Sequence, residues 1–164
     1  MKTADVAVRL ARAADAVDIA AMSRDYIEDG LPWTWTAGRV EAAIREADIN
    51  VVVAGERRAI SAFGIMSYPD DDAHLLLFAV RMTQRRRGVG SAILRWLEEA
   101  ADTAGAKRIR VECRRDNAAA RNFYCEHGYD ELSITKKFYR GLKDGIHLVK
   151  WLRPDEVQPL NETR

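Results

Sequence analysis

The chain has few cysteines and no long apolar segment. The spacing of its two cysteines, Cys113 and Cys125, matches neither a zinc-binding pattern nor a CxxC redox motif. We therefore expect two reduced thiols and no metal site. No segment approaches the ~20 apolar residues of a membrane-spanning helix, and the first residues lack the apolar stretch of a secretory signal peptide. These absences predict a cytoplasmic protein that does not act in a membrane.

The chain also lacks an excess of charge of either sign. Its 26 basic and 25 acidic residues give a formal net charge of +1. A protein built around a nucleic acid usually has a basic excess. Any cluster of arginines is therefore local, which favours a small anionic ligand without excluding nucleic acid.

The remaining composition is that of a globular domain. Of the 164 residues, 48% are hydrophobic and 31% are charged, which is enough apolar material for a sizeable core. This length predicts one domain. We place it at residues 1–152 and expect the polar, proline-containing residues 153–164 to form a loose tail.

The hydrophobic period predicts alternating strands and helices. Strands are expected at 6–10, 49–54, 59–68, 74–80, 107–113, 129–139 and 146–152, with a turn at 55–58. Helices are expected at 13–29, 37–47, 91–104 and 118–127. This order mixes hairpins with strand–helix–strand units. It predicts an α/β (α+β) fold: a mixed, mostly antiparallel sheet of about seven strands with helices on both faces.

Several residues are expected to define the helices. Thr36 and Asn117 are candidate N-caps, and Gly105 and Gly128 are candidate C-terminal stops. The expected apolar faces are Val17, Ala20, Ala21 and Tyr26 in the first helix, Val40, Ala43, Ile44 and Ala47 in the second, and Ile93, Leu97, Ala100 and Ala104 in the third. In the fourth helix, Phe123 shares a face with Ala119 and Ala120, which favours it over Tyr124 as a core residue.

The stretch QRRRGVGSAILRWLEEA, residues 84–100, has the features of an anion site. A strand, a short turn with Gly88 and Gly90, and a helix follow one another. Free N–H groups and a partial positive charge lie at a helix N-terminus, and glycines let a ligand approach the backbone closely. The turn lacks the Lys-Ser/Thr pair of a Walker A loop. It is also a poor dinucleotide fingerprint, because Ile93 stands where a third glycine is needed.

Two motifs in register resemble the GNAT superfamily of N-acetyltransferases. The segment from Arg85 to Gly90 is similar to the [QR]-x-x-G-x-[GA] element that binds acetyl-coenzyme A. The segment NAAARNFYCEHGYD is similar to the family's N-x-x-[AS]-x-x-x-Y-x-x-x-G-[FY] element, matched here by Asn117, Ala120, Tyr124, Gly128 and Tyr129. The resemblance covers about residues 5–152.

The resemblance implies an acetyl-coenzyme A site and no metal. Backbone amides from Arg85 to Ser91 would hold the pyrophosphate, and the strand end at 78–80 would pair with the pantetheine arm. The implied coenzyme-binding residues are Phe78, Ala79, Val80, Arg85, Arg86, Arg87, Gly88, Val89, Gly90, Ser91, Asn117 and Tyr124. The N–H of Phe78 would polarise the acetyl carbonyl, and Asn117 either contacts the coenzyme, caps its helix or does both.

The resemblance also suggests acid and base residues. The phenol of Tyr124 would protonate the departing thiolate. His74 is the candidate base, because an unperturbed imidazole pKa of ~6.5 suits proton uptake near neutral pH. Asp72 is the alternative, and no base is needed if the acceptor is already partly deprotonated. Neither cysteine has an evident base partner, so direct transfer is expected rather than an acyl-enzyme.

The amine acceptor is expected beside the loop YIEDGLPWTWTAGR. Trp33 and Trp35 are expected either to pack on the acceptor or to fill a gap between helix and sheet. Glu28 and Asp29 would attract an ammonium, and Tyr139 belongs to a second possible wall. Polyamines, amino acids, aminoglycoside-like amines and protein N-termini all remain open as acceptors.

Three functions are compatible with these residues. The leading one is an acetyl-coenzyme A-dependent N-acetyltransferase, a monomer or a homodimer, acting on an unidentified small molecule or protein. The second is a catalytically silent coenzyme A-binding regulatory module, against which the presence of Tyr124 argues. The third is a nucleic-acid-binding module using Arg85–Arg87, which the balanced charge disfavours.

Overall fold

The computed structural model describes residues 6–56 and 59–153. Residues 154–164 of the expected tail, and Arg57 and Arg58 of the expected turn, lie outside the described residues. The strands are β1 (Val8–Leu10), β2 (Ile49–Glu56), β3 (Ala59–Ser67), β4 (Asp72–Val80), β5 (Arg108–Arg114), β6 (Asp130–Tyr139) and β7 (Lys143–Trp151). The α-helices are α1 (Ala16–Met22), α2 (Ala37–Arg45), α3 (Val89–Thr103) and α4 (Ala118–Glu126), with the short helical turns η1 (Ala13–Asp15), η2 (Ser23–Ile27) and η3 (Met82–Gln84).

The seven strands form one sheet in the order β1-β2-β3-β4-β5-β7-β6. Neighbouring strands are antiparallel except β4 and β5, which are parallel and are joined by α3. The predicted order of elements and the predicted mixed, mostly antiparallel sheet are confirmed.

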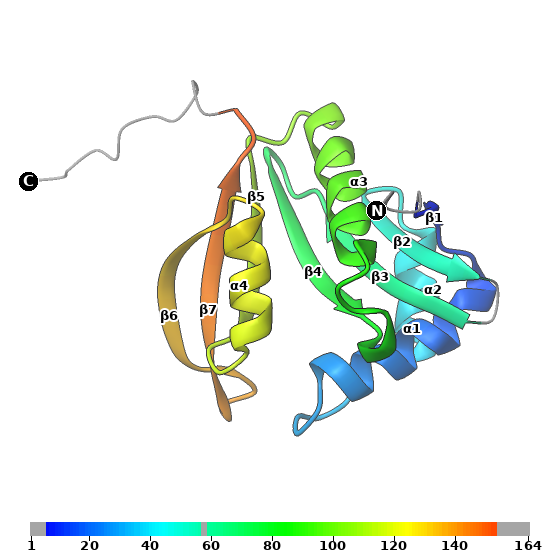
Figure 1. The fold of residues 1–164 in the computed structure, drawn as a ribbon, viewed down its shortest axis with the longest axis horizontal. Coiled ribbons are helices and arrows are strands. Elements are labelled where there is room, and N and C mark those ends of the chain that lie inside the picture. The colour runs from blue at the N-terminus through cyan, green and yellow to red at the C-terminus, as the bar shows by residue number, and fades with distance from the viewer. Residues whose placement is uncertain (1–5, 57–58, 154–164) are drawn as a thin grey trace, which may run out of the picture.

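Two apolar clusters cover opposite faces of the sheet. On one face, α3 packs Ile93, Leu94 and Leu97 against the sheet, and α4 adds Tyr124. On the other face, α1 and α2 pack Ile19 and Val40 against β2, β3 and the end of β4. Figure 1 shows α3 and α4 on the near side, with α1 and α2 grouped at the β1–β4 end of the sheet. The β5–β7–β6 end is thus left to strands and loops on the α1–α2 side.

The helix boundaries confirm the predicted caps and stops. The Thr36 side chain accepts a hydrogen bond from the Arg39 N–H (3.4 Å), and Asn117 Oδ1 accepts one from the Ala120 N–H (3.1 Å). Gly105 and Gly128 have φ angles of 86° and 88°, the left-handed conformation that ends a helix without a Cβ penalty.

Parts of the expected helix faces were wrong. Val17 is 67% exposed, and the first helix instead buries Ala16, Ile19 and Ala20 before a π-turn at η2 breaks its register. An alanine-rich segment offers little contrast between its faces. The second helix ends at Arg45, so Ala47 lies beyond it.

Two further predictions of which residues are buried were wrong. In α3 the buried row runs through Ile93, Leu97 and Ala101, while Ala104 is exposed. In α4 the expected order is reversed, since Tyr124 is buried and Phe123 only partly so. Ala100 and Ala101 point in directions about 100° apart on the helix, but both are alanines next to the apolar row, so the sequence does not indicate which of them is covered.

A β-bulge at Leu76 changes which way β4 faces. Met66 of β3 pairs with Leu75 and Ile65 pairs with Leu77, so Leu76 is an extra residue. Before the bulge, Ala73 and Leu75 belong to the cluster under α3. After it, Leu77 and Ala79 belong to the cluster under α1 and α2. His74 therefore faces the α1–α2 side, whereas Phe78 and Val80 face α3 and α4.

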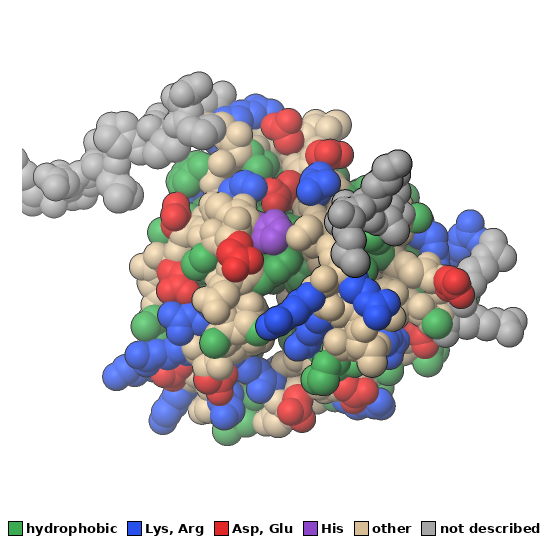
Figure 2. Space-filling model, viewed as in Figure 1, with side chains coloured by type: hydrophobic (Ala, Val, Ile, Leu, Met, Phe, Trp, Pro, Cys, Tyr) green, Lys and Arg blue, Asp and Glu red, His purple; other side chains and the backbone are tan. Residues whose placement is uncertain are grey.

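The parallel pairing of β4 and β5 ends early. It runs from Asp72–Arg108 to Leu75–Val111 and then stops, although β4 continues to Val80 and β5 to Arg114. The two strand ends separate beyond this point, next to the start of α3. Figure 2, which shows the α3–α4 side, has an opening between the two helices with Lys and Arg side chains at its edge.

Candidate active site

The predicted anion turn lies between the end of β4 and the start of α3. Gly88 has a φ of 77° and precedes the helix, whose first internal bond runs from the Ala92 N–H to the Gly88 carbonyl. The N–H groups of Val89, Gly90 and Ser91 thus come before the helical ladder, as an anion site requires. A Cβ on Gly90 would lie 3.1 Å from Val80 Cγ2 and 3.4 Å from the Phe123 ring. The bare backbone at Gly90 is therefore needed for close approach.

The three arginines of the turn differ in placement. Arg85 Nε donates to the Val80 carbonyl at 3.3 Å, and its guanidinium lies 5.7 Å from the Tyr26 ring centre. Arg86 and Arg87 are exposed. Arg85 therefore joins the turn to β4, and the two others lie at the solvent side.

Replacing Gly88 by alanine tests the left-handed turn. We expect Gly88→Ala to lower the free energy of unfolding by about 1–2 kcal/mol, because an L-residue is strained at this φ. Gly38→Ala is the matched control: Gly38 is an exposed residue of α2 without a positive φ, so alanine should raise stability by up to about 1 kcal/mol. Urea unfolding measures both. Equal effects of the two substitutions would contradict a strained turn.

An aromatic group lies between α3 and α4 beside this turn. Phe78 stacks on Phe123 with ring centres 5.3 Å apart, and Tyr124 lies 6.2 Å from Phe78. Burial raises the pKa of Tyr124 well above its usual range, and Cys113, Tyr139 and Glu112 add to the shift. The phenol is thus protonated throughout the physiological pH range.

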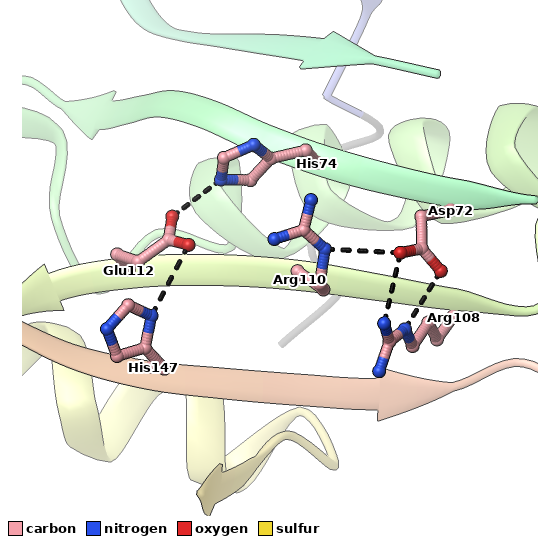
Figure 3. Close-up of polar contacts among 6 residues, drawn as sticks. All are labelled: Asp72, His74, Arg108, Arg110, Glu112 and His147. Carbon is pink, nitrogen blue, oxygen red and sulfur yellow. Dashed lines mark hydrogen bonds and ion pairs between the residues drawn. The ribbon is translucent and has the colours of Figure 1, made fainter. Parts of the chain in front are cut away.

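On the other face of the sheet, His74 takes part in a three-strand polar cluster. His74 Nε2 of β4 lies 2.6 Å from Glu112 Oε2 of β5, and His147 Nδ1 of β7 lies 3.5 Å from Glu112 Oε1. Thr135 Oγ1 lies 2.7 Å from the other nitrogen of His147. Figure 3 shows the Glu112 carboxylate between the two imidazoles.

The charge state of Glu112 follows from these contacts. Burial alone would raise the pKa of Glu112, but the hydrogen bond from His74 and the charges of His74, His147 and Arg110 outweigh it and lower the pKa. The carboxylate is therefore ionised at neutral pH and is 14% exposed. It can accept a proton through His74 or directly.

Asp72, the alternative base, lies on the same face as His74 but is tied to arginines. Its carboxylate receives a two-point bond from Arg108, at 2.8 and 3.1 Å, and lies 3.3 Å from Arg110 Nε. The bond from Arg108 is the main cause that lowers the pKa of Asp72. The Asp72 carboxylate is thus held as the partner of two arginines, whereas the ion-pair contacts of Glu112 are with imidazoles.

The residues expected at the acceptor loop have two kinds of surroundings. Glu28 is buried and accepts bonds from Ser23 Oγ (2.9 Å), the Thr34 N–H (2.7 Å) and Thr34 Oγ1 (2.6 Å). Its carboxylate thus stabilises the loop, which leaves little capacity for an ammonium. Asp29 was also expected to attract the ammonium; its backbone carbonyl accepts a bond from Arg114.

The aromatic residues expected to line the acceptor site contact charged or aromatic neighbours. Trp33 is 44% exposed and lies 5.5 Å from the Arg24 guanidinium, while Trp35 packs 3.9 Å from that of Arg39. Tyr139 contacts Phe138 edge to face at 5.0 Å. Burial raises the pKa of Tyr139, and the charges of Cys113 and Glu112 add to the shift.

Sequence reasoning missed Glu112 and His147. The alternation of KRIRVEC indicates that Glu112 faces away from Cys113 and thus away from the core. It does not indicate that His74 and His147 lie on either side, because that depends on which strands neighbour β5. No local signal marks His147.

Comparison with known proteins places the chain in a family. Residues 19–129 match the model of the Acetyltransferase (GNAT) family. The chain belongs to the GNAT acetyltransferase family. The resemblance inferred from the two sequence motifs is thereby confirmed.

Curated relatives of this GNAT chain match over part of their length. An uncharacterized N-acetyltransferase of Methanocaldococcus jannaschii is 32% identical over 54% of this chain and 57% of its own length. The [ribosomal protein bS18]-alanine N-acetyltransferase of Salmonella typhimurium is 32% identical over 62% of this chain and 70% of its own length. The chain thus spans a little over half of the first of these relatives.

Solved structures share the GNAT fold over nearly the whole chain. Ard1 from Thermoplasma volcanium has a TM-score of 0.78 at 22% identity, covering 90% of this chain and 98% of its own. The ribosomal-protein-S18-alanine N-acetyltransferase of Escherichia coli has a TM-score of 0.73 at 23% identity, covering 95% and 97%. The PaiA N-acetyltransferase of Thermoplasma acidophilum, solved with coenzyme A, has a TM-score of 0.71 at 15% identity, covering 88% and 98%.

The other expected features of the GNAT chain concern metal ions, membranes and the two thiols. Within residues 6–56 and 59–153, no group of three or more His, Cys, Asp or Glu side chains is arranged to hold a metal ion. No described helix is both long and apolar enough to cross a membrane. Cys113 is buried, and burial raises its pKa to about 11, whereas Cys125 is exposed.

Proposed function

We propose that this protein is an acetyl-coenzyme A-dependent N-acetyltransferase that moves the acetyl group to a primary amine by direct attack in a ternary complex. The observation that carries the proposal is the place where β4 and β5 separate. The turn before α3 and Tyr124 lie on one face of the sheet there, and the His74–Glu112 pair lies on the other. A thioester in the gap would have a proton donor on one side and an acceptor on the other.

The coenzyme is assigned to the α3–α4 side. The N–H groups of the Gly88–Ser91 turn would hold the pyrophosphate, and Arg86 and Arg87 would lie near the outer phosphates. The free edge of β4 at 78–80 would pair with the pantetheine arm, with the Phe78 N–H directed at the acetyl carbonyl. Asn117 already caps α4, so its side chain has a structural role in any case.

The amine is assigned to the α1–α2 side. An ammonium must lose a proton before it can attack a thioester. The His74–Glu112 pair would take that proton, because the ionised carboxylate stabilises the imidazolium that forms. Tyr124 would then protonate the departing thiolate from the opposite face. Cys113 stays protonated below about pH 11, which favours direct transfer over an acyl-enzyme.

The acceptor is a primary amine of a small molecule or a protein. The similarity to alanine N-acetyltransferases of a ribosomal protein makes a protein N-terminus one candidate. A silent coenzyme A-binding module is the second candidate function. A protonated Tyr124 on one face of the sheet and an ionised Glu112 on the other favour the enzyme, because binding alone needs neither group.

The test is calorimetry with coenzyme A followed by an amine panel with thiol release as the readout. We expect coenzyme A to bind with micromolar affinity and at least one class of amine to accelerate thiol release. Failure to bind coenzyme A would overturn the proposal altogether. Binding without release on any amine would indicate the silent module.

A further inference from the structure

Three arginines project from β5 on the acceptor side of the sheet. Arg108, Arg110 and Arg114 alternate with Ile109, Val111 and Cys113, which are buried under α3 and α4. Because side chains alternate across a strand, the arginines share the face of Glu112. The acceptor surface is thus a row of guanidinium groups interrupted by one carboxylate.

These guanidinium groups are only partly neutralised. Both carboxylate oxygens of Asp72 accept hydrogen bonds from Arg108. Arg114 donates to the backbone carbonyls of Ile27 and Asp29, which are uncharged partners. Three arginines therefore face two carboxylates, Asp72 and Glu112, and Glu112 is engaged by imidazoles. An uncompensated positive charge remains.

Arg110 is the arginine with free hydrogen-bonding capacity. Its Nε lies 3.3 Å from Asp72 Oδ2 but is buried without a hydrogen bond of good geometry. Among the described residues, neither of its terminal nitrogens has a hydrogen-bond partner, and the side chain is 36% exposed. Figure 3 shows the guanidinium between Asp72 and His74, with its terminal nitrogens directed away from Asp72.

Arg110 and Glu112 are two residues apart on the same face, a separation of ~6.6 Å along the strand. A ligand with an amine at the His74–Glu112 pair would thus bring a neighbouring group to Arg110. A guanidinium presents paired N–H donors that match a carboxylate better than any neutral group. Asp72, which is itself held by Arg108, would hold the Arg110 side chain in position.

We propose that the acceptor carries a carboxylate that binds Arg110 while its amine lies at the His74–Glu112 pair. The inference rests on the proposed acetyl transfer and narrows its acceptor to amino acids or polypeptides with an acidic N-terminal residue. Both sources present the same chemistry, an amine and a carboxylate a few atoms apart. Neutral and polycationic amines would be poorer acceptors, because they leave Arg110 unpaired or bring like charge to it.

The test compares matched acceptors that differ only in the carboxylate. The small-molecule pair is γ-aminobutyrate and its amide; the peptide pair is Asp-Ala-Ala and Asn-Ala-Ala, both with amidated C-termini. We expect the carboxylate of at least one pair to raise kcat/KM for thiol release about 10-fold or more over its neutral partner. The pair that shows the preference identifies whether the acceptor is a small amino acid or a polypeptide.

Variants assign the preference to Arg110. Arg110→Gln should bring the ratio within a pair close to one, and Arg110→Lys, which keeps the charge but not the paired donors, should leave an intermediate ratio. Arg95→Gln, at an exposed residue of α3, should leave the ratio unchanged. Thermal unfolding checks that each variant folds. If Arg110→Gln does not fold, the ratio measured with Arg110→Lys alone is sufficient for the test.

Three outcomes would overturn the inference: equal rates within both pairs for the wild type, a preference for the neutral partner, or a carboxylate preference that survives in the Arg110 variants. In each of them the neutral amines still release thiol, so the proposed acetyltransferase activity stands. Absence of release with every amine would instead count against that activity.

Discussion

Tyr124→Phe is expected to lower turnover about 100-fold or more and to change the affinity for coenzyme A only a few-fold. The substitution removes the phenolic proton but keeps the ring that packs between Phe78 and Tyr129. General acid catalysis by a positioned side chain contributes about 10²–10⁴ in rate. Thiol release measures the turnover, and calorimetry measures coenzyme A binding.

Tyr129→Phe is the matched control. The Tyr129 hydroxyl is buried without a hydrogen-bond partner, so its removal should leave stability unchanged or raise it by about 1 kcal/mol. Turnover should not change, because Tyr129 is not placed at the gap between β4 and β5. If Tyr124→Phe were as active as the wild type, Tyr124 would not be the proton donor. If both variants lost activity alike, the loss would reflect packing.

Glu112→Gln is expected to lower kcat/KM at neutral pH about 100-fold and to alter the acidic limb of the pH–rate profile. In the wild type, the rate should fall as the His74–Glu112 pair takes up a proton, with apparent pKa values that belong to the pair. Glutamine stabilises the imidazolium less than the carboxylate does, so in the variant the imidazole should lose its proton more readily and the acidic limb should move to lower pH. His74→Ala should abolish this limb; if the limb persisted in His74→Ala, His74 would not be the base.

Glu112 should also affect the free energy of unfolding in a pH-dependent way. The pKa of Glu112 in the folded protein lies below its ordinary value of 4.5, so its ionised form is favoured by folding. That contribution is present above about pH 4.5 and is lost as the pH falls through the lower, folded-state pKa. Glu112→Gln should therefore be less stable than the wild type at pH 7, and the difference should shrink below pH 4.5.

Glu98→Gln separates the catalytic effect from the stability effect. Glu98 has a similar exposure of 15% and pairs with Lys150 at 2.7 Å, but it projects from α3 on the opposite side of the sheet. We expect it to lose stability without losing kcat/KM. Equal losses of kcat/KM in the two variants would show that the Glu112 effect is structural.

Local patterns were sufficient to predict the architecture and the glycine turn that precedes α3. The strand and helix periods, the two N-caps and the glycine stops all act within a few residues, and they were found as expected. The same reasoning failed where faces depend on partners. Tyr124 rather than Phe123 is buried, because the position of α4 on the sheet, which its own sequence does not determine, decides which ring is covered.

The candidate site was only partly predictable for a similar reason. His74 was identified by its type, but its partners Glu112 and His147 come from β5 and β7, which are 38 and 73 residues further along the chain. Only the strand order 4-5-7 brings the three together. Glu28 was expected to face a ligand, yet its oxygens are used by a loop whose geometry no periodicity describes.

The bulge at Leu76 affects how the sequence of β4 can change in evolution. It lets one continuous strand direct His74 to the side proposed for the acceptor and Phe78 to the side proposed for the coenzyme. Substitutions before Leu76 can therefore alter the acceptor side without disturbing the residues on the coenzyme side. Loss of Leu76 itself would leave Leu75 and Leu77 adjacent and make the ladder regular, because Met66 and Ile65 already pair with these two residues. His74 and Phe78 would then still face opposite sides of the sheet, so the strand can lose its bulge without exchanging the two sets of side chains.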